Sequence, residues 1–373
     1  MFSLKKQNID WLLVACIIPI VGAGVLTMSS FVGNDIYFMR QVIWFLISFT
    51  VFLGLSSIDF RFLKQSNFLI ILYACSLVFL GLIFVLGIDA KGATRWLSIG
   101  SVSIQVSDFV KLILIIILAK YFSRRHVEIK NIKHLFISGI YMALPVGLVF
   151  LQPDFGTALI LFFIWFVMTL VSGISKKHLA IVFGVGLVLV TVLWTSVLQD
   201  YQKNRITSFL NPLSDIQGTG YNAYQSTIAV GSGQILGKGV GYGTQSRLKF
   251  LPEYHTDFIF AAFAEEWGFV GVMILFILYC VIIWRILRAA RYGATNFEML
   301  YAVGLAMLFS VHIIVNIGMN IGYLPVTGLT LPFMSYGGSH MLMSFIGLGI
   351  LMGLRRNERS IHRDDMSKEF LGL

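Results

Sequence analysis

Long apolar stretches separated by short polar ones recur along nearly the whole chain. A helix needs about 20 mostly apolar residues to cross the roughly 30 Å hydrocarbon core of a bilayer, and these stretches are of that order. The pattern therefore predicts an all-α polytopic membrane protein that forms a single domain over residues 1–373. We place ten membrane-spanning helices at residues 11–30, 38–56, 67–87, 109–122, 135–151, 155–172, 179–199, 257–284, 299–322 and 337–354.

Polar segments interrupt this pattern mainly on one side of the predicted bundle. The longest, residues 200–256, predicts a large extracytoplasmic loop between the seventh and eighth helices. Segments 91–111, 151–157 and 322–339 fall on the same side, whereas residues 355–373 form a polar cytoplasmic tail. Irregular backbone is not viable in contact with lipid, so such segments must pack on one another or line a wet cavity. We expect them to form one outward-facing polar cleft.

The composition supports a membrane protein and explains the net charge. Hydrophobic residues make up 57% of the chain and charged residues 12%, against roughly 25% charged residues in soluble domains. A net charge of +10 can indicate nucleic-acid binding, but the basic residues cluster in segments such as 120–133 and 285–291. By the positive-inside rule that side is cytoplasmic, together with both termini. Orientation and anionic lipid account for the charge, so we expect no nucleic-acid partner.

Carboxylates stand at the start of the eighth predicted helix and inside it, in FLPEYHTDFIFAAFAEEWG (250–268). Asp257 is either the N-cap of this helix or a general base at the floor of the cleft. Glu265 and Glu266 lie two turns further on, where a carboxylate is costly unless it is paired or solvated. At 100° per residue, only Glu265 could face the same side as Asp257. We expect both glutamates to make buried structural pairs.

Three further groups of residues belong to the predicted cleft, each with two interpretations. Asp108 and Lys111, three residues apart, form a structural ion pair, or Lys111 joins Arg95 in an anion site. Asp154, in QPDFGT, makes a turn or helix cap, or it faces the cleft. The glycine-rich segment 218–250 carries several cations but matches neither a Walker A loop nor a Rossmann fingerprint. It either cradles phosphate or is a compact loop.

Several long motifs occur in a fixed order, namely RWLSIG, QPDFGT, GYNAYQSTIAVGSG, GKGVGYGTQ, HTDFIFAAFAEEWG and GYLPVTGLTLPFMSYGGS. Together they resemble the SEDS family of shape, elongation, division and sporulation proteins, over roughly residues 10–355. The form GYNAYQSTIAVGSG followed by GTQ is more similar to the rod-shape members than to the division members.

This resemblance implies a peptidoglycan glycosyltransferase that works in cell elongation. It would polymerise lipid II into β-1,4 glycan strands at the outer face of the bacterial cytoplasmic (inner) membrane. The implied partners are a class B penicillin-binding protein, which crosslinks the strands, and the elongation machinery.

The resemblance also implies roles for single residues. The family's essential aspartate in HTDFIF falls on Asp257, the arginine of its RW motif on Arg95, the aspartate of its QPDxGT motif on Asp154, and a motif lysine on Lys111. As a hypothesis, Asp257 accepts the proton of the attacking 4-hydroxyl while cations stabilise the departing undecaprenyl pyrophosphate, in an inverting displacement. Mg²⁺ or Mn²⁺ is a candidate cofactor. The candidate residues for binding the sugar or pyrophosphate of lipid II are Arg95, Lys111, Asp154, Arg205, Gln245, Arg247, Lys249, His255 and Ser335.

The sequence departs from the family pattern at Asp108, where glutamate is typical, and at Val106, Trp267 and His340, where proline, leucine and serine are typical. The first departure leaves the geometry of the pair with Lys111 open. Two alternatives from other functional classes remain. A lipid II flippase would carry charges through the bilayer midplane, and a non-catalytic scaffold for the penicillin-binding protein would act through its helix surfaces. The polar motifs concentrate on one face, which favours surface chemistry over translocation.

Overall fold

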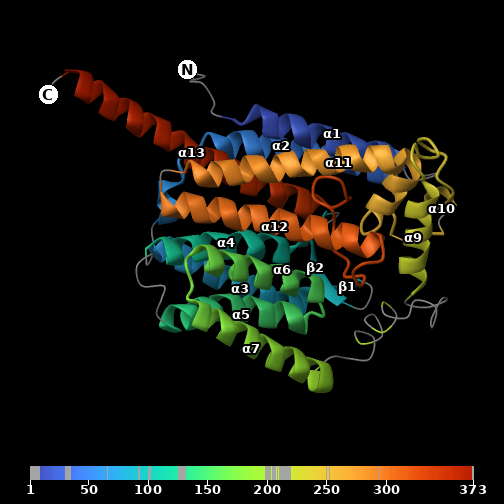
Figure 1. The fold of residues 1–373 in the computed structure, drawn as a ribbon, viewed down its shortest axis with the longest axis horizontal. Coiled ribbons are helices and arrows are strands. Elements are labelled where there is room, and N and C mark those ends of the chain that lie inside the picture. The colour runs from blue at the N-terminus through green and yellow to red at the C-terminus, as the bar shows by residue number, and fades with distance from the viewer. Residues whose placement is uncertain are drawn as a thin grey trace.

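The structure is a computed structural model. Helices make up most of the chain and lie side by side in one bundle (Figure 1). α13 leaves the bundle at one end, whereas α9, α10 and the strands lie toward the other. The structure describes residues 9–29, 35–64, 66–90, 93–99, 102–124, 132–197, 203, 207, 209, 220–248, 250–251, 253–293 and 295–371.

Each predicted apolar stretch overlaps one long helix. Within the described ranges, eight helices are long and apolar enough to cross a membrane. α6 is an apolar helix of 17 residues, and α4 carries Asp108, Lys111 and Lys120 among its 18 residues. The chain is therefore a multi-pass membrane protein. The long helices are α1 (Trp11–Ser29), α2 (Asp35–Ser56), α3 (Ser66–Leu86), α4 (Val106–Ser123), α5 (Ile132–Leu151), α6 (Phe155–Val171), α7 (Lys176–Val192), α11 (Ile259–Arg291), α12 (Asn296–Asn320) and α13 (Gly338–Leu371).

The prediction of an all-α fold is wrong in one respect, because a small sheet follows α3. Strands β1 (Ile88–Ala90), β2 (Ala93–Ile99) and β3 (Val102–Gln105) form an antiparallel sheet in that order. Trp96 pairs with Gln105, and Ile99 pairs with Val102. The strands satisfy one another's backbone groups, β2 and β3 lie within the predicted polar segment 91–111, and β3 leads directly into α4.

Other boundaries also differ from the prediction. α9 (Tyr221–Ser232) and α10 (Thr244–Arg247) lie within the segment predicted as one large loop. α11 has 33 residues and runs past the predicted end at 284, and α13 continues as helix through most of the predicted tail. These helices are longer than a bilayer requires, so the apolar pattern alone could not set their ends.

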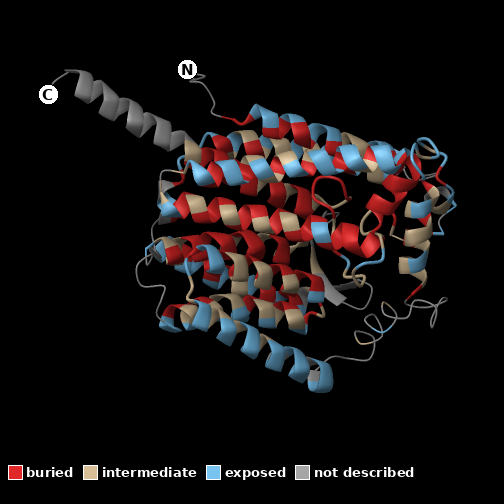
Figure 2. Ribbon diagram, in the orientation of Figure 1, coloured by how far each residue is buried: buried red, intermediate tan, exposed pale blue. Residues whose placement is uncertain are grey.

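α12 lies at the centre of the bundle, and α7 lies at its edge. Figure 2 shows α12 largely buried and α7 largely exposed. In α12, 78% of the most apolar window is buried, whereas none of the corresponding window of α7 is. Close packing at α12 depends on Gly304, where a Cβ would lie 2.7 Å from the Ile115 side chain of α4. Polar residues on α12 are therefore held in the interior, where they can position a site.

The segment after α9 packs directly on a kink in α11. The kink is at Gly268, which has φ 64° and ψ −167°. Beside it, Phe269 N donates to Gln234 O at 2.9 Å and Lys238 N donates to Glu265 O at 3.0 Å. A Cβ at Gly268 would collide with the backbone nitrogen of Gly237. Glycine is thus required for both its positive φ and this close backbone approach.

Gly268→Ala is expected to lower the free energy of unfolding by about 1–3 kcal/mol, because alanine is strained at this φ and its Cβ meets backbone. Thermal unfolding of the purified protein in detergent measures the loss. Gly184→Ala is the matched control, since a Cβ at this glycine in α7 meets nothing within 4 Å. Equal melting temperatures for the two variants would contradict the packing argument.

Candidate active site

Asp257 lies just before α11, outside its capping position. The N-cap residue is Phe258 and the helix begins at Ile259, so the interpretation of Asp257 as the N-cap is wrong. Two amides of α12 hold its backbone, because Asn316 Nδ2 and Asn320 Nδ2 each donate to the Asp257 carbonyl at 3.0 Å. The half-buried side chain of Asp257 therefore extends from a fixed backbone.

A glycine turn borders the Asp257 carboxylate. Gly328 has φ +74°, and a Cβ at this position would lie 3.5 Å from Asp257 Oδ2. The next residue, Leu329, accepts a hydrogen bond from Asn316 Nδ2 at 2.6 Å. Asn316 therefore joins the backbone of Asp257 to the loop that follows α12 and fixes the distance between them.

The same loop is tied to the two residues before Asp257. Ser335 Oγ donates to Thr256 O at 2.7 Å and accepts from Leu331 N at 2.8 Å. Tyr336 N donates to His255 O at 2.8 Å. Ser335 is 3% exposed, so its hydroxyl holds the two segments together from below the surface.

His255 brings α2 to the site. Its ring stacks on Tyr37 of α2 with centroids 4.3 Å apart and an interplanar angle of 22°. Its Nε2 lies 4.0 Å from Glu253 Oε2. The segment from Glu253 to Asp257 is thus enclosed by α2, α12 and the loop after α12, three parts of the chain that are distant in sequence.

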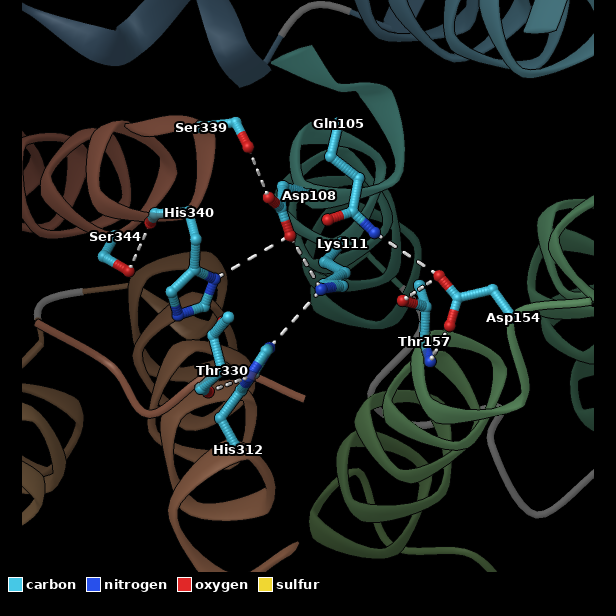
Figure 3. Close-up of polar contacts among 10 residues, drawn as sticks. All are labelled: Gln105, Asp108, Lys111, Asp154, Thr157, His312, Thr330, Ser339, His340 and Ser344. Carbon is cyan, nitrogen blue, oxygen red and sulfur yellow. Dashed lines mark hydrogen bonds and ion pairs between the residues drawn. The ribbon is translucent and has the colours of Figure 1, made fainter. Parts of the chain in front are cut away.

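A buried polar cluster around Asp108 and Lys111 joins α4 to α13 (Figure 3). Lys111 Nζ donates to Asp108 Oδ1 at 2.9 Å, and Ser339 Oγ donates to Asp108 Oδ2 at 3.0 Å. His340 Nδ1 lies 3.8 Å from Asp108 Oδ1. Asp108 and Lys111 are 2% and 1% exposed. Two of the departures from the family pattern, Asp108 and His340, thus lie side by side.

His312 of α12 connects this cluster to the loop after α12, which borders Asp257. Its Nδ1 lies 3.0 Å from Thr330 O, and its Nε2 lies 3.4 Å from Lys111 Nζ. A carbonyl only accepts and an ammonium only donates, so the geometry assigns the ring proton to Nδ1 and leaves Nε2 as the acceptor. Lys111 therefore binds both a carboxylate and a neutral imidazole, and through His312 it holds Thr330, two residues from Gly328.

The α12 residues of the site were not predicted, although their spacing in the sequence carries a signal. His312, Asn316 and Asn320 follow one another at four-residue intervals in an apolar helix, which places them on one face. Polar side chains in that pattern inside a membrane-spanning helix indicate a functional or structural site. Thr330 and Ser339 carry no such signal. Thr330 lies in the loop after α12 and Ser339 at the start of α13, so only the folded chain brings them to the cluster.

Asp154 occupies the N-cap of α6. Its Oδ1 accepts from Thr157 N at 3.1 Å and its Oδ2 from Thr157 Oγ1 at 2.8 Å. Gln105 Nε2, at the end of β3, donates to Asp154 Oδ2 at 3.4 Å. Of the two interpretations of Asp154, these contacts match the helix cap, and they link the cap to the sheet.

Glu265 makes a buried structural pair, as predicted, and its partners lie in the segment between α9 and α11. Lys238 Nζ lies 2.7 Å from Glu265 Oε1, which also accepts from Thr244 N at 2.8 Å and from Gln245 N at 3.2 Å. Glu266 Oε1 accepts from Gly241 N at 3.0 Å. Backbone amides that could have cradled phosphate thus bind carboxylates of the chain itself, and the described part of 218–250 consists of α9, α10 and a connection that packs on α11.

Glu265→Gln is expected to loosen this loop, because a charge-assisted contact with a cation and two amides is lost. Hydrogen exchange at the Thr244 and Gln245 amides should be faster by about tenfold to a hundredfold, since such a contact is worth about 1.5–3 kcal/mol. Glu298→Gln, in the first turn of α12, is the matched control. Unchanged exchange at both amides would show that Glu265 does not order the loop.

Four candidate cations are not fully placed. Arg205 and Lys249 lie outside the described residues, and so do the side chains of Arg95 and Arg247, whose backbones belong to β2 and α10. A cation held by protein alone needs several ligands in one place. In the part of the chain that the structure describes, no group of three or more His, Cys, Asp and Glu is placed to hold a metal ion. The described residues therefore do not fit a Mg²⁺ or Mn²⁺ ion held by protein ligands alone.

Comparisons with known proteins identify relatives over most of the chain. The family model FtsW/RodA/SpoVE, described as "Cell cycle protein", matches residues 7–360. The peptidoglycan glycosyltransferase MrdB of Escherichia coli K12 is 38% identical over 292 residues, which are 78% of this chain and 79% of MrdB.

Solved structures are similar as well. One chain, from a peptidoglycan synthase complex solved to show the coordination of polymerization and crosslinking, matches with a TM-score of 0.80 at 30% identity, over 93% of this chain and 98% of that one. The rod shape determining protein RodA of Thermus thermophilus matches with a TM-score of 0.71 at 28% identity, over 95% of this chain and 98% of RodA.

Proposed function

The chain belongs to the FtsW/RodA/SpoVE family of cell cycle proteins, and from that premise we propose that it is a peptidoglycan glycosyltransferase that polymerises lipid II. The observation that carries the proposal is the placement of Asp257. Its backbone is held by Asn316 and Asn320, and its carboxylate lies beside the turn at Gly328. A half-buried carboxylate on a fixed backbone suits a general base.

The proposed topology has ten membrane spans, with α4 and α6 added to the eight long apolar helices. Both termini are cytoplasmic, and the large loop between the seventh and eighth spans is extracytoplasmic. The basic residues near 120–133 and 285–291 support this orientation. Asp257 then faces the outer side of the bacterial inner membrane, where a membrane-bound sugar substrate can reach it.

The proposed reaction is a single inverting displacement. The 4-hydroxyl oxygen of an incoming lipid II attacks the anomeric carbon of the growing strand and passes its proton to Asp257. The bond from that carbon to undecaprenyl pyrophosphate breaks, and the pyrophosphate leaves as an anion with the bonding electrons. The pyrophosphate needs no proton donor. Besides the base, the reaction therefore requires positive charge fixed near the leaving group.

The cations divide into two proposed roles. Arg95, Arg205, Arg247 and Lys249 are the candidates for contact with the pyrophosphate. Lys111 is 1% exposed and held by Asp108 and His312. We assign it a positioning role, because it supports the loop from Thr330 toward Gly328.

The proposed partner is a class B penicillin-binding protein of the elongation machinery. The similarity to a chain of a peptidoglycan synthase complex supports a crosslinking partner, and the similarity to a rod shape determining protein supports the role in elongation.

Polymerisation of labelled lipid II in detergent tests the proposal. The purified chain is combined with its penicillin-binding protein, whose transpeptidase is blocked by a β-lactam. If the chain is a glycosyltransferase, the two proteins together produce muramidase-sensitive strands. Either protein alone can be inactive without contradicting the proposal. A flippase has no second compartment to transport into and gives none, and a scaffold gives no more polymer than the partner alone.

A further inference from the structure

A cavity of about 330 Å³ lies between α3, α4 and α5. Leu69 and Ile70 from the start of α3 line it, together with Ile117, Lys120 and Arg124 from the end of α4. In the proposed topology these helix ends are cytoplasmic, so the cavity is on the opposite side of the membrane from Asp257. None of its lining residues contributes to the site described above.

The walls of the cavity are mainly apolar, and its mouth is at the edge of the bundle. Leu69 and Ile117 are 4% and 7% exposed, whereas Ile70 is 64% exposed. Tyr73 also lines the cavity, and its hydroxyl proton is donated to Tyr141 O at 2.8 Å. This proton is therefore not available to a ligand, and an aliphatic chain entering from the bilayer past Ile70 would meet hydrocarbon and aromatic rings.

Two cations line the cavity at the C-terminal end of α4. Lys120 is in the last turn of α4 and Arg124 is its C-cap. From Ile117 to Arg124 the helix rises by about 10 Å, so the lining changes from apolar to basic along the direction of the membrane normal. A lipid molecule shows the same change, from acyl chain to phosphate.

An ordinary role for the cations explains only part of this arrangement. Basic residues at a helix C-terminus complement the helix dipole, and on the cytoplasmic side they help to orient the chain. Neither effect accounts for the apolar hollow that the two cations border. Arg carries five N–H donors and Lys three, so each can bind a phosphate as well as a protein group.

We propose that this cavity binds one anionic phospholipid of the cytoplasmic leaflet. Its phosphate lies between Lys120 and Arg124, and one acyl chain runs along Leu69, Tyr73 and Ile117. Basic pockets between membrane helices on this side are suited to such headgroups. The site goes beyond the proposed polymerisation, because it uses different residues at the other end of the bundle.

Native mass spectrometry of the full-length protein tests the proposal, with phosphatidylglycerol and phosphatidylcholine of identical acyl chains as probes. The wild type should retain one phosphatidylglycerol in preference to phosphatidylcholine. Lys120→Ala with Arg124→Ala should weaken retention by about 30-fold, because each cation near the surface contributes about a factor of five. Lys176→Ala with Lys177→Ala, two exposed lysines at the start of α7, is the matched control and should bind as the wild type does.

A second variant separates a built cavity from general surface charge. Ile70→Trp keeps both cations but narrows the mouth at an exposed position, and it should also lose the bound lipid. Equal retention by the double alanine variant would overturn the proposal, as would equal loss in the α7 control. Equal binding of phosphatidylcholine would do so too, and displacement of the lipid by millimolar inorganic phosphate would show a free-phosphate site instead.

Discussion

Asp257→Asn is expected to lower the rate of glycan polymerisation by about 10²- to 10⁴-fold, the range typical of a lost general base. The substitution keeps the size of the side chain and removes its negative charge. Asn316 and Asn320 bind the backbone carbonyl of residue 257, so the substitution leaves their hydrogen bonds in place. Binding of lipid II should therefore change little, and the loss should fall on kcat with KM nearly unchanged.

Glu253→Gln is the matched control for this prediction. Glu253 is a second carboxylate of the same segment, four residues earlier, with its Oε2 3.2 Å from Thr256 Oγ1. Neutralising it changes the local charge by the same amount but leaves the proposed base intact. Kinetics with labelled lipid II on both variants decide between the two carboxylates. If Glu253→Gln lowers the polymerisation rate as much as Asp257→Asn does, the local negative charge is what matters, and Asp257 is not the base.

Lys111→Met is expected to lower the free energy of unfolding by about 3–5 kcal/mol, because breaking a buried ion pair leaves its partner charge uncompensated. The stranded partner is Asp108, which is 2% exposed. Ser339 still donates to it, but one neutral hydroxyl does not replace an ammonium. Denaturant or thermal unfolding of the purified protein measures the effect.

The double variant Asp108→Asn with Lys111→Met is the control. It removes both charges, so it should recover much of the stability that Lys111→Met loses, as a positive coupling in a double-mutant cycle. A double variant no more stable than Lys111→Met would show that the pair does not act as a unit. A single variant as stable as the wild type would contradict the burial of a charged pair.

The helices were predictable from the sequence because membrane spans follow from one local quantity, the length of an apolar run. The small sheet was not. Its strands occupy a short stretch between α3 and α4, and the register that pairs Trp96 with Gln105 is not described by apolar periodicity. The length of α11 was underestimated, because its last turn carries Arg288 and Arg291, and such residues usually mark the end of an apolar span.

The site was predictable only where one segment carries it. HTDFIF made Asp257 the candidate base, which stays a prediction, and the three-residue spacing predicted the contact between Asp108 and Lys111, which is confirmed. The contact between Lys111 and His312 joins positions 201 residues apart, so no local spacing could reveal it. The N-cap interpretation of Asp257 failed for the opposite reason, since capping propensity is local whereas the start of α11 is set by packing on α12 and the following loop.

We propose Asp257 as the base of a glycan polymerase. The most direct test of this role is the yield of muramidase-sensitive polymer from labelled lipid II, with the cognate class B penicillin-binding protein, for the wild type and Asp257→Asn at equal folded amounts. We expect polymer from the wild type and almost none from Asp257→Asn. Equal polymer from the two proteins would contradict it.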